Sequence, residues 1–370
     1  MEHNVCAHRR SVISVFHMPR GWLPALWKPC RQTWGAYQVA KERYADWVNR
    51  GRKPPAHQDF ADYVRFAVEK SGADVFFGPV TGLRARKRRW TVVQIDRDRR
   101  VTTTAGFHGV VVTGPGPAAR TFPKVQDPRV FTGQTFWSKL TTVRRLLKNA
   151  KGEIVVIGGG GTAAAIAAWF VRAGLNKRKI VLLNDQATVF TRTTNFFENQ
   201  IFDDDGAWLS LSEKDRKSFT DRLNRGVVWE SVTEVLTDAE QLRLVPGRAT
   251  TVKHGVHRRG AHRADLVVEY TDHRGSFDLP ADLVVDAAGF DAWWFRTLLP
   301  DRLGVELRDK SRLDELQRTM REDLSLSLAD WPRLHAPMCS QVVGPGFMSL
   351  MVLGAMSDRI LAPYVMAAMA

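Results

Sequence analysis

Cysteine is scarce in this sequence. The 370 residues include three cysteines, Cys6, Cys30 and Cys339, and no two of them form a C-x-x-C spacing. A disulfide scaffold or a zinc ribbon needs more cysteines at closer spacing, so both are excluded as the organising feature of the fold. Widely spaced thiols are typical of a reducing compartment, and we therefore expect a cytoplasmic protein.

Long apolar runs are also missing. The N-terminal run at 12–16 is too short for the apolar segment of a secretion signal. The stretch 347–370 is apolar, but Asp358 and Arg359 interrupt it and Pro363 falls within it. A helix that spans a membrane needs about 20 predominantly apolar residues. We therefore expect no membrane span.

Acidic residues are outnumbered, with 39 Asp and Glu against 54 Lys and Arg, which gives a formal net charge of +15. The basic residues are spread along the chain, and the one dense run, 84–89, lies between Val80 and Trp90, as the exposed end of a β-hairpin would. No nucleic-acid-binding motif accompanies the charge. We therefore expect no nucleic-acid partner, and the positive field favours a polyphosphate cofactor instead.

The sequence does contain a glycine-rich turn between an apolar strand and an alanine-rich helix. The strand at 154–157 runs into Gly158, and Gly160, Gly161 and Thr162 open the helix. Gly158 permits a tight turn, and Gly160 lets the backbone approach a pyrophosphate. The amides at the helix N-terminus favour an anion. The pattern predicts a dinucleotide site, against the alternative of a flexible glycine loop without a ligand.

The residues after the next strand select the nucleotide. The strand at 179–183 is followed by Asn184 and then Asp185. An acid at this place holds the ribose hydroxyls of NAD, whereas neutral or basic groups accommodate the additional phosphate of NADP. Arg192 and the basic residues at 177–179 favour NADPH.

The other segments follow ordinary patterns of helices, strands and loops. We expect helices at 33–49, 60–70, 137–149 and 212–224, strands at 74–77, 90–95, 109–112 and around Val227 and Val235, and a basic hairpin at 252–270. Three histidines in that hairpin are interpreted as part of a solvated loop rather than as a metal site. The segment 191–202, rich in amides and aromatics, is interpreted as a loop that walls a substrate site. The segment 344–348 is expected to open a helix that reaches Leu361.

Two strand ends suggest the domain order. The strand at 109–112 runs into Thr113 and Gly114, as in flavoproteins where the chain passes to an inserted pyridine-nucleotide domain, and 286–289 repeats this ending where the chain would return. We expect an α/β, two-dinucleotide-binding (FAD/NADPH) Rossmann-like flavoprotein fold. A partial FAD-type domain and connector would occupy 1–150, an NADPH-binding domain 151–285, and the C-terminal return to the FAD-type domain 286–370.

The chain resembles the flavin-dependent N-hydroxylases of siderophore biosynthesis, and within them the lysine N6-hydroxylases of mycobactin and nocobactin assembly. The strings that carry the resemblance are YADWVNRGR at 44–52, VVIGGG at 155–160, FTR at 190–192, FFEN at 196–199, RGV at 225–227, WF at 294–295, GPGF at 344–347 and SDR at 357–359. They are spread over nearly the whole chain.

The resemblance implies FAD- and NADPH-dependent hydroxylation of the side-chain amine of L-lysine, with O₂ as co-substrate and a flavin hydroperoxide as the oxygen donor. The amine must be neutral to offer its lone pair, and the pKa of a free lysine side chain is about 10.4. The site must therefore favour the neutral amine, for example by desolvation. An apolar lining of Phe196, Phe197 and Phe202 is our hypothesis for that desolvation.

The resemblance also implies roles for individual residues. Asn199 would hold the amino-acid head of the substrate, with Ser349 as a second substrate contact and Asn224 facing the nicotinamide and the flavin as the catalytic residue. A loop-capping amide is the structural alternative for Asn199, and a helix C-terminal asparagine is the alternative for Asn224. The implied cofactor contacts are Gly158, Gly160, Gly161, Thr162, Asn184 and Arg192 for NADPH, and Val80, Thr113, Gly114, Gly346 and Phe347 for FAD.

The sequence departs from the family pattern at its start. Family members begin with a strand and a glycine fingerprint for FAD, and no G-x-G-x-x-G lies upstream of Arg31. We therefore expect the first βαβ unit of the FAD domain to be missing, and FAD binding to be weak or absent. Three alternatives stay open: a complete enzyme whose start is assigned too far downstream, an NADPH-binding remnant without catalysis, and a basic NADP-responsive binding protein. Whether the substrate is lysine or ornithine, and whether the chain forms a homo-oligomer, also stay open.

Overall fold

The computed structural model describes residues 13–16, 33–51, 55, 57–149, 152–174, 178–186, 188–191, 196–224, 227–255, 266–348 and 352–369. The chain divides into two compact units. Unit 1 comprises Met1–Thr113, Phe295–Pro337 and Gly354–Ala370, and unit 2 comprises Gly114–Trp294 and Met338–Leu353.

Unit 2 is built on a parallel sheet of five strands in the order β11-β8-β7-β15-β6. The strands are β6 (Val130–Thr132), β7 (Ile154–Ile157), β8 (Ile180–Asn184), β11 (Leu242–Pro246) and β15 (Leu283–Asp286). Every residue of β7, β8 and β15 is buried. Continuous apolar runs of this kind are typical of parallel strands covered on both faces, which is why the sequence predicted these three strands.

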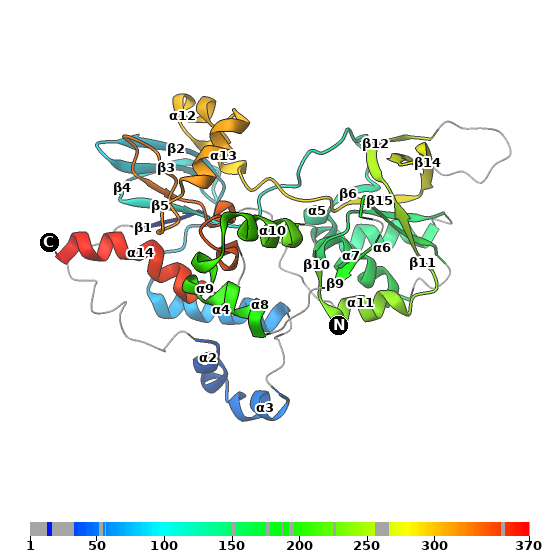
Figure 1. The fold of residues 1–370 in the computed structure, drawn as a ribbon, viewed down its shortest axis with the longest axis horizontal. Helices are drawn as coiled ribbons and strands as arrows, with labels where there is room; N and C mark the ends of the chain where they lie inside the picture. The colour runs from blue at the N-terminus through cyan, green and yellow to red at the C-terminus, as the bar shows by residue number, and fades with distance from the viewer. Residues whose placement is uncertain are drawn as a thin grey trace. The chain divides into compact units, whose positions relative to one another are not determined.

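The two faces of this sheet carry different layers. The helices α5 (Gly133–Ser138), α6 (Leu140–Asn149), α7 (Gly161–Arg172) and α11 (Glu230–Thr237) pack on one face, around Val156, Leu182 and Val285. An antiparallel meander of β12 (Arg248–His254), β13 (Leu266–Asp272) and β14 (Gly275–Ala281) packs on the other, around Val155, Val181 and Val284. Alternate side chains of each strand therefore enter opposite cores. Figure 1 shows α5, α6 and α7 beside the strands of this sheet.

A second group of elements in unit 2 gathers around Phe219. It comprises α8 (Phe196–Asp203), α9 (Asp205–Ser210) and α10 (Glu213–Asn224). The parallel pair of β9 (Phe190–Thr191) and β10 (Val227–Val228) lies instead beside α7, where Val228 joins the core of the main sheet. Phe219 contacts the rings of Phe202 and Trp208. Trp208 is 1% exposed, and its indole N–H donates to the carbonyl of Val342 at 3.0 Å. This hydrogen bond ties α9 to the C-terminal segment that holds the short helices η2 (Pro337–Cys339) and η3 (Pro345–Met348).

Unit 1 contains an antiparallel meander of β2 (Val80–Arg86), β3 (Arg89–Ile95) and β4 (Val101–Phe107). Its main anchor is Trp90, which is 0% exposed, stacks on Trp331 at 6.1 Å and donates its indole N–H to the carbonyl of Arg333 at 2.9 Å. Lys87 and Arg88 form the turn between β2 and β3 with φ of 50° and 57°. The basic run at 84–89 is thus the end of a hairpin, as the sequence predicted.

A smaller sheet of unit 1 has the order β1-β5-β16, from β1 (Ile13–Phe16), β5 (Gly109–Val112) and β16 (Arg333–His335). β16 is parallel to β5, whereas β1 is antiparallel to it. The remaining elements of unit 1 are α2 (Trp34–Ala40), α3 (Tyr44–Asn49), α4 (His57–Ser71), η1 (Trp294–Leu298), α12 (Asp301–Glu306), α13 (Lys310–Arg318) and most of α14 (Leu353–Met369). The short apolar run near the N-terminus thus forms a strand at 13–16.

Several sequence-based expectations about elements are wrong. The helix expected at 33–49 is two helices, because Glu42 takes a φ of 56° between them, and the helix expected at 137–149 is divided at Lys139. The expected strand at 74–77 is not a strand, since no described strand pairs with it. Val235 lies in helix α11, which packs on α7. The C-terminal helix begins at Leu353, and Pro363 is accommodated inside it.

Within the described residues, no helix has the length and apolar character needed to cross a membrane.

One buried polar contact fixes the C-terminal helix to the small sheet of unit 1. His335 on β16 is 0% exposed; its Nδ1 lies 2.6 Å from the carbonyl oxygen of Asp323 and its Nε2 lies 2.7 Å from the hydroxyl of Tyr364 on α14. A neutral ring that donates from Nδ1 and accepts at Nε2 satisfies both partners. Burial lowers the pKa of His335, because desolvation disfavours the charged ring.

We expect this histidine to make stability depend on pH. Above about pH 6.5 the ring is neutral in both the folded and the unfolded chain; below it the unfolded chain binds the proton more readily. Stability should therefore fall as the pH decreases below about 6.5, by up to about 1.4 kcal/mol per pH unit. Urea unfolding of the wild type and of His335→Gln from pH 7.5 to 5 measures this. The variant should be less stable at pH 7.5 and should show a shallower slope.

His273→Gln is the matched control, because His273 is exposed on the turn between β13 and β14. Its slope should equal that of the wild type. Equal slopes for the wild type and His335→Gln would contradict the assignment of the effect to His335.

Candidate functional site

The turn after β7 fits only a glycine at its first position. Gly158 has a φ of +127°, and its N–H donates to the carbonyl of Leu183 at 2.8 Å. A Cβ on this residue would lie 2.5 Å from the carbonyl oxygen of Ala287. A Cβ on Gly159 would lie 3.3 Å from the side chain of Asn184. The turn is therefore tight and closely packed against the ends of β15 and β8, as the glycine turn of a dinucleotide fold is.

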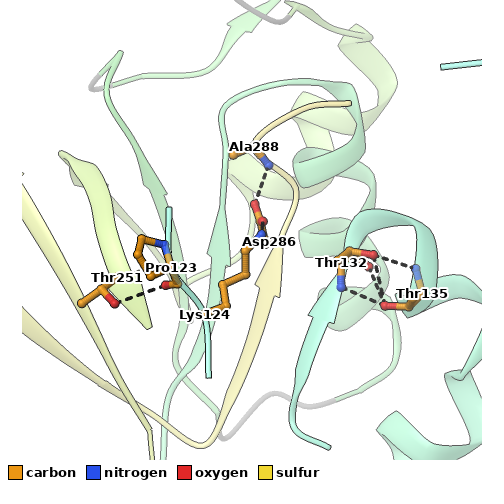
Figure 2. A network of polar contacts seen from close by, with 7 residues as sticks. All are labelled: Pro123, Lys124, Thr132, Thr135, Thr251, Asp286 and Ala288. Atoms are coloured by element: carbon orange, nitrogen blue, oxygen red, sulfur yellow. Dashed lines mark hydrogen bonds and ion pairs between the residues drawn. The ribbon is translucent and has the colours of Figure 1, made fainter. Parts of the chain in front are cut away.

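The helix that follows starts without a side-chain cap. Gly160 is the N-cap of α7 in extended conformation and makes no side-chain hydrogen bond, and Ala163 and Ala164 behind it are 0% and 1% exposed. Helix α5 starts at the same edge of the sheet and is capped differently: Thr132 and Thr135 exchange side-chain and backbone hydrogen bonds at 2.8 and 3.1 Å (Figure 2). The first amides of α7, among them those of Gly161 and Thr162, therefore keep their donors for an anion.

Asn184 lies at the carboxyl end of β8, next to this turn. The residue is 4% exposed, and its Oδ1 accepts from the backbone N–H of Gln186 at 3.0 Å. Its Nδ2 is buried and has no hydrogen-bond partner in the described part of the chain. A buried donor without a partner is costly. A nucleotide whose adenosine ribose or phosphate oxygens accept from Nδ2 would satisfy it, so the residues present fit a dinucleotide.

One part of the sequence-based argument for NADPH is wrong. Arg178 and Lys179 precede β8, whereas Asn184 is its last residue, and five residues of strand span about 16 Å. Arg178 also donates to the carbonyl of Leu147. These two cations therefore lie at the amino edge of the sheet, away from the turn at Gly158. Arg192 lies outside the described residues.

A buried charge pair at this edge was not found from the sequence. The ammonium of Lys124 pairs with the carboxylate of Asp286, and the two side chains are 18% and 2% exposed (Figure 2). Asp286 ends β15, the strand beside β7. The strand order reverses between these two strands, and in open α/β sheets ligands bind outside the strand ends at such a switch point. The sequence signal that could have indicated this pair is the single acidic residue at the end of the apolar run 283–285.

The segment expected to wall a substrate site is helical from Phe196 on. Asn199 lies on α8, partly buried, and its side chain makes no hydrogen bond to any residue that the structure describes. The backbone of α8 approaches η3 closely, because a Cβ on Gly346 would overlap the carbonyl oxygen of Phe202. Gly346 and Phe347 are both buried there. The structure thus brings α8, the helix that carries the predicted substrate residue Asn199, against η3, which holds Gly346 and Phe347, two of the predicted flavin contacts.

Helix α10 joins the same group. The guanidinium of Arg222 pairs with the carboxylate of Glu198 on α8 at 2.5 Å. Asn224 is the last residue of α10, as its alternative interpretation supposes, and its side chain lies outside the described residues. Its role in catalysis stays a prediction. Ser349 also lies outside the described residues.

The aromatic lining proposed from the sequence is not seen. Phe196 and Phe197 are 69% and 75% exposed, because they form the first turn of α8 and contact each other rather than a core. Phe202 instead packs on Phe219. No group of three or more His, Cys, Asp or Glu side chains that could hold a metal ion occurs among the described residues.

The predicted flavin residues are divided between the units. Val80 begins β2 and Thr113 follows β5 in unit 1, whereas Gly114, Gly346 and Phe347 belong to unit 2. In a dinucleotide fold the pyrophosphate lies on a turn that joins a parallel strand to a helix. The described residues of unit 1 contain no such turn, and β1 is antiparallel to β5. They therefore do not supply the pyrophosphate cradle of FAD.

We expect Gly158→Ala to remove dinucleotide binding and to destabilise the protein. The φ of Gly158 alone costs an alanine about 1–3 kcal/mol, and the contact with Ala287 adds about 1–3 kcal/mol. Isothermal titration with NADP⁺ and urea unfolding measure the two effects. Affinity for NADP⁺ should fall at least about tenfold, because the cradle must open to admit the Cβ.

Gly275→Ala is the matched control. Gly275 has a φ of +137° on the turn between β13 and β14, and a Cβ there would meet no atom within 4 Å. It should lose about 1–3 kcal/mol from backbone strain and keep its NADP⁺ affinity. Equal NADP⁺ affinity in the Gly158 and Gly275 variants would show that the nucleotide does not bind at this turn.

Comparison with known sequences gives a consistent result. The model of the family described as L-lysine 6-monooxygenase/L-ornithine 5-monooxygenase matches residues 29–292. L-lysine N6-monooxygenase MbtG of Mycobacterium sp. (strain MCS) is 34% identical over 340 residues, which cover 90% of this chain and 74% of the relative. The MbtG protein of Mycobacterium tuberculosis (strain ATCC 25618 / H37Rv) is 32% identical with the same coverage.

Solved structures show the same fold. Lysine monooxygenase NbtG from Nocardia farcinica, whose NADPH domain is described as having an unprecedented conformation, is 26% identical with a TM-score of 0.69, over 89% of this chain and 76% of that one. The ornithine N-hydroxylase KtzI of Kutzneria sp. 744 is 19% identical with a TM-score of 0.74, over 93% and 85%. The chain has the two-dinucleotide-binding, Rossmann-like α/β fold of these flavoproteins, and it belongs to the L-lysine 6-monooxygenase/L-ornithine 5-monooxygenase family of FAD- and NADPH-dependent N-hydroxylating enzymes.

Proposed function

We propose that this chain binds NADPH at the turn after β7 and N-hydroxylates the side-chain amine of L-lysine. The observation that supports this most is the turn itself: Gly158 leaves no room for a Cβ, Gly159 lies closely against Asn184, and Asn184 presents a buried, unpartnered donor within the described chain. Lysine is favoured over ornithine because the MbtG relatives, at 32–34% identity, are named L-lysine N6-monooxygenases.

The choice of NADPH over NADH rests on Asn184. A carboxylate at the end of the second strand would repel a 2′-phosphate, whereas an amide can donate to it. Asp185, the next residue, lies on the turn and is exposed, so solvent screens its charge. The buried amide is therefore the group that faces the nucleotide.

Amino-acid placement is assigned to the group of α8, α10 and η3. The Glu198–Arg222 pair links α8, which carries Asn199 in its middle, to α10, which ends at Asn224, and Asn199 offers a partly buried amide. An amide can accept from an α-ammonium and donate to an α-carboxylate, which are the two groups of an amino-acid head. When bound, FAD supplies the activation of oxygen in this family. In this proposal the described residues of this chain serve nucleotide binding and amino-acid placement.

The decisive assay uses the full chain with added FAD. We expect NADPH oxidation that depends on L-lysine and yields a hydroxylamine, with kcat/KM at least about tenfold higher for NADPH than for NADH, because the amide at position 184 favours the 2′-phosphate. L-ornithine and NADH are the controls, and the visible absorbance of the purified protein gives the flavin content.

Two results would contradict this proposal. Hydroxylamine formed from L-ornithine but not from L-lysine would overturn the substrate. A chain that binds NADPH, stays colourless with added FAD and forms no hydroxylamine would be the NADPH-binding remnant instead.

We expect Asn199→Ala to raise the KM for L-lysine about tenfold, since one charge-assisted hydrogen bond to the substrate contributes about 1.5–3 kcal/mol. The affinity for NADP⁺ should not change. Gln200→Ala is the matched control, because Gln200 is the exposed neighbour of Asn199 on α8. The same KM in both variants would remove Asn199 from the substrate site.

A further inference from the structure

The strongest unassigned feature is the buried pair of Lys124 and Asp286. Their positions are 162 residues apart in the sequence, and they meet at the edge of the sheet where the strand order reverses. The proposed chemistry uses neither side chain. A carboxylate that is 2% exposed is costly to bury unless it is paired and hydrogen-bonded. We therefore looked for a function of this pair other than packing.

Lys124 is held rigidly from its backbone. The segment 123–125 runs beside β12: Val252 donates to the carbonyl of Pro123 and Val125 donates to the carbonyl of Val252, both at 2.9 Å. The hydroxyl of Thr251 donates to the same Pro123 carbonyl at 3.2 Å (Figure 2). The ammonium of Lys124 also lies 4.8 Å from the ring centroid of Phe122. The backbone of Lys124 is therefore held in place where its ammonium reaches Asp286.

Asp286 transmits this position to the turn that follows β15. Its Oδ1 accepts from the backbone N–H of Ala288 at 3.0 Å, while its other oxygen, Oδ2, takes the Lys124 ammonium (Figure 2). Ala287, between them, donates its N–H to the carbonyl of Ile157 at 2.8 Å. The carbonyl of Ala287 is the atom that a Cβ on Gly158 would meet. The carboxylate of Asp286 therefore links the ammonium of Lys124 to the backbone at Ala287 and Ala288, which packs against Gly158.

The same wall also limits the start of α7. A Cβ on Gly133 would lie 2.8 Å from Cγ2 of Thr162 and 3.7 Å from Cβ of Ala287. Thr162 belongs to the first turn of α7, and Gly133 opens α5. Gly133, Thr162 and Ala287 therefore lie close together at this edge, and a displacement of Ala287 would act on the cradle through Gly158, since close-packed interiors transmit strain.

We propose that Lys124 and Asp286 are positioning residues for the nucleotide: Asp286 holds the turn 287–289 against Gly158 through its hydrogen bond with Ala288, Lys124 compensates the buried charge of Asp286, and together they set the affinity for NADP(H). This inference rests on the proposed function, because it takes the glycine turn as the NADPH site. Neither side chain contacts the nucleotide in this role. The pair acts through the backbone of Ala287 and Ala288.

Three variants separate the roles of this pair. Lys124→Met keeps the chain length and leaves the buried carboxylate without its cation. Adding Asp286→Asn to Lys124→Met removes the remaining charge and keeps an Oδ1 that accepts from Ala288. Lys253→Met is the matched control, because Lys253 pairs with Glu269 across β12 and β13 at a more exposed site, with side chains 48% and 34% exposed.

The main measurement is the Kd for NADP⁺ by isothermal titration of the full chain. We expect Lys124→Met to raise the Kd about tenfold, because an uncompensated buried charge displaces the turn. The double variant should return to within about threefold of the wild type, and Lys253→Met should not change the Kd. A double variant as weak as Lys124→Met would mean that Lys124 contacts the nucleotide directly, which overturns a purely positioning role. An unchanged Kd in every variant would overturn the inference, because the pair would then affect stability alone.

A second measurement does not need a ligand. Hydrogen exchange of the peptide that contains Ala288, read by mass spectrometry on the free protein, should be faster in Lys124→Met and restored in the double variant. If the wild type fails to bind NADP⁺, the proposed function fails, while this exchange still tests the pair. Equal exchange in the wild type and Lys124→Met would overturn the inference.

Discussion

The close approach of the Gly158 and Ala287 backbones is the constraint on which unit 2 depends. It can occur because β7 and β15 are neighbouring parallel strands, so their carboxyl ends meet at one edge, and because Gly158 has no Cβ. A side chain at 158 would push the two strand ends apart or block the space above the helix start. The nucleotide site is thus a consequence of how two strands end, and the rest of the sheet keeps those ends in register.

The strands that form this edge could be predicted from the sequence, because the signal was local. The runs at 154–157, 180–183 and 283–285 are apolar and are followed by glycine or a polar residue, and all three lie in buried strands. Asn184 could be predicted for the same reason, since the end of the second strand has a fixed relation to the glycine turn.

The sequence was misleading where contacts with residues distant in the sequence determine the structure. The residues 74–77 have the composition of a strand, but no described strand pairs with them, and Phe76 and Phe77 are 66% and 60% exposed. Val235 has strand propensity, yet with Val232 and Leu236 it presents a helical face to α7. Lys124 and Asp286 form an ion pair although they are 162 residues apart in the sequence, and no local sequence pattern predicts such a pair. Propensity is overruled in each case by contacts that a single sequence does not display.

Asp286 and Asn184, the two buried polar side chains at the sheet edge, differ in whether their hydrogen-bonding atoms have partners. This difference indicates different roles. Asp286 has both of its oxygens occupied from within the protein, by Lys124 and by Ala288, so it requires nothing from a ligand. Asn184 has its oxygen occupied by Gln186, but its Nδ2 is buried without a partner in the described chain. Leaving a donor unsatisfied costs about 1–3 kcal/mol, which a ligand oxygen would recover on binding. The satisfied carboxylate therefore shapes the site and the unsatisfied amide receives the ligand, although both end strands that flank β7 in one sheet.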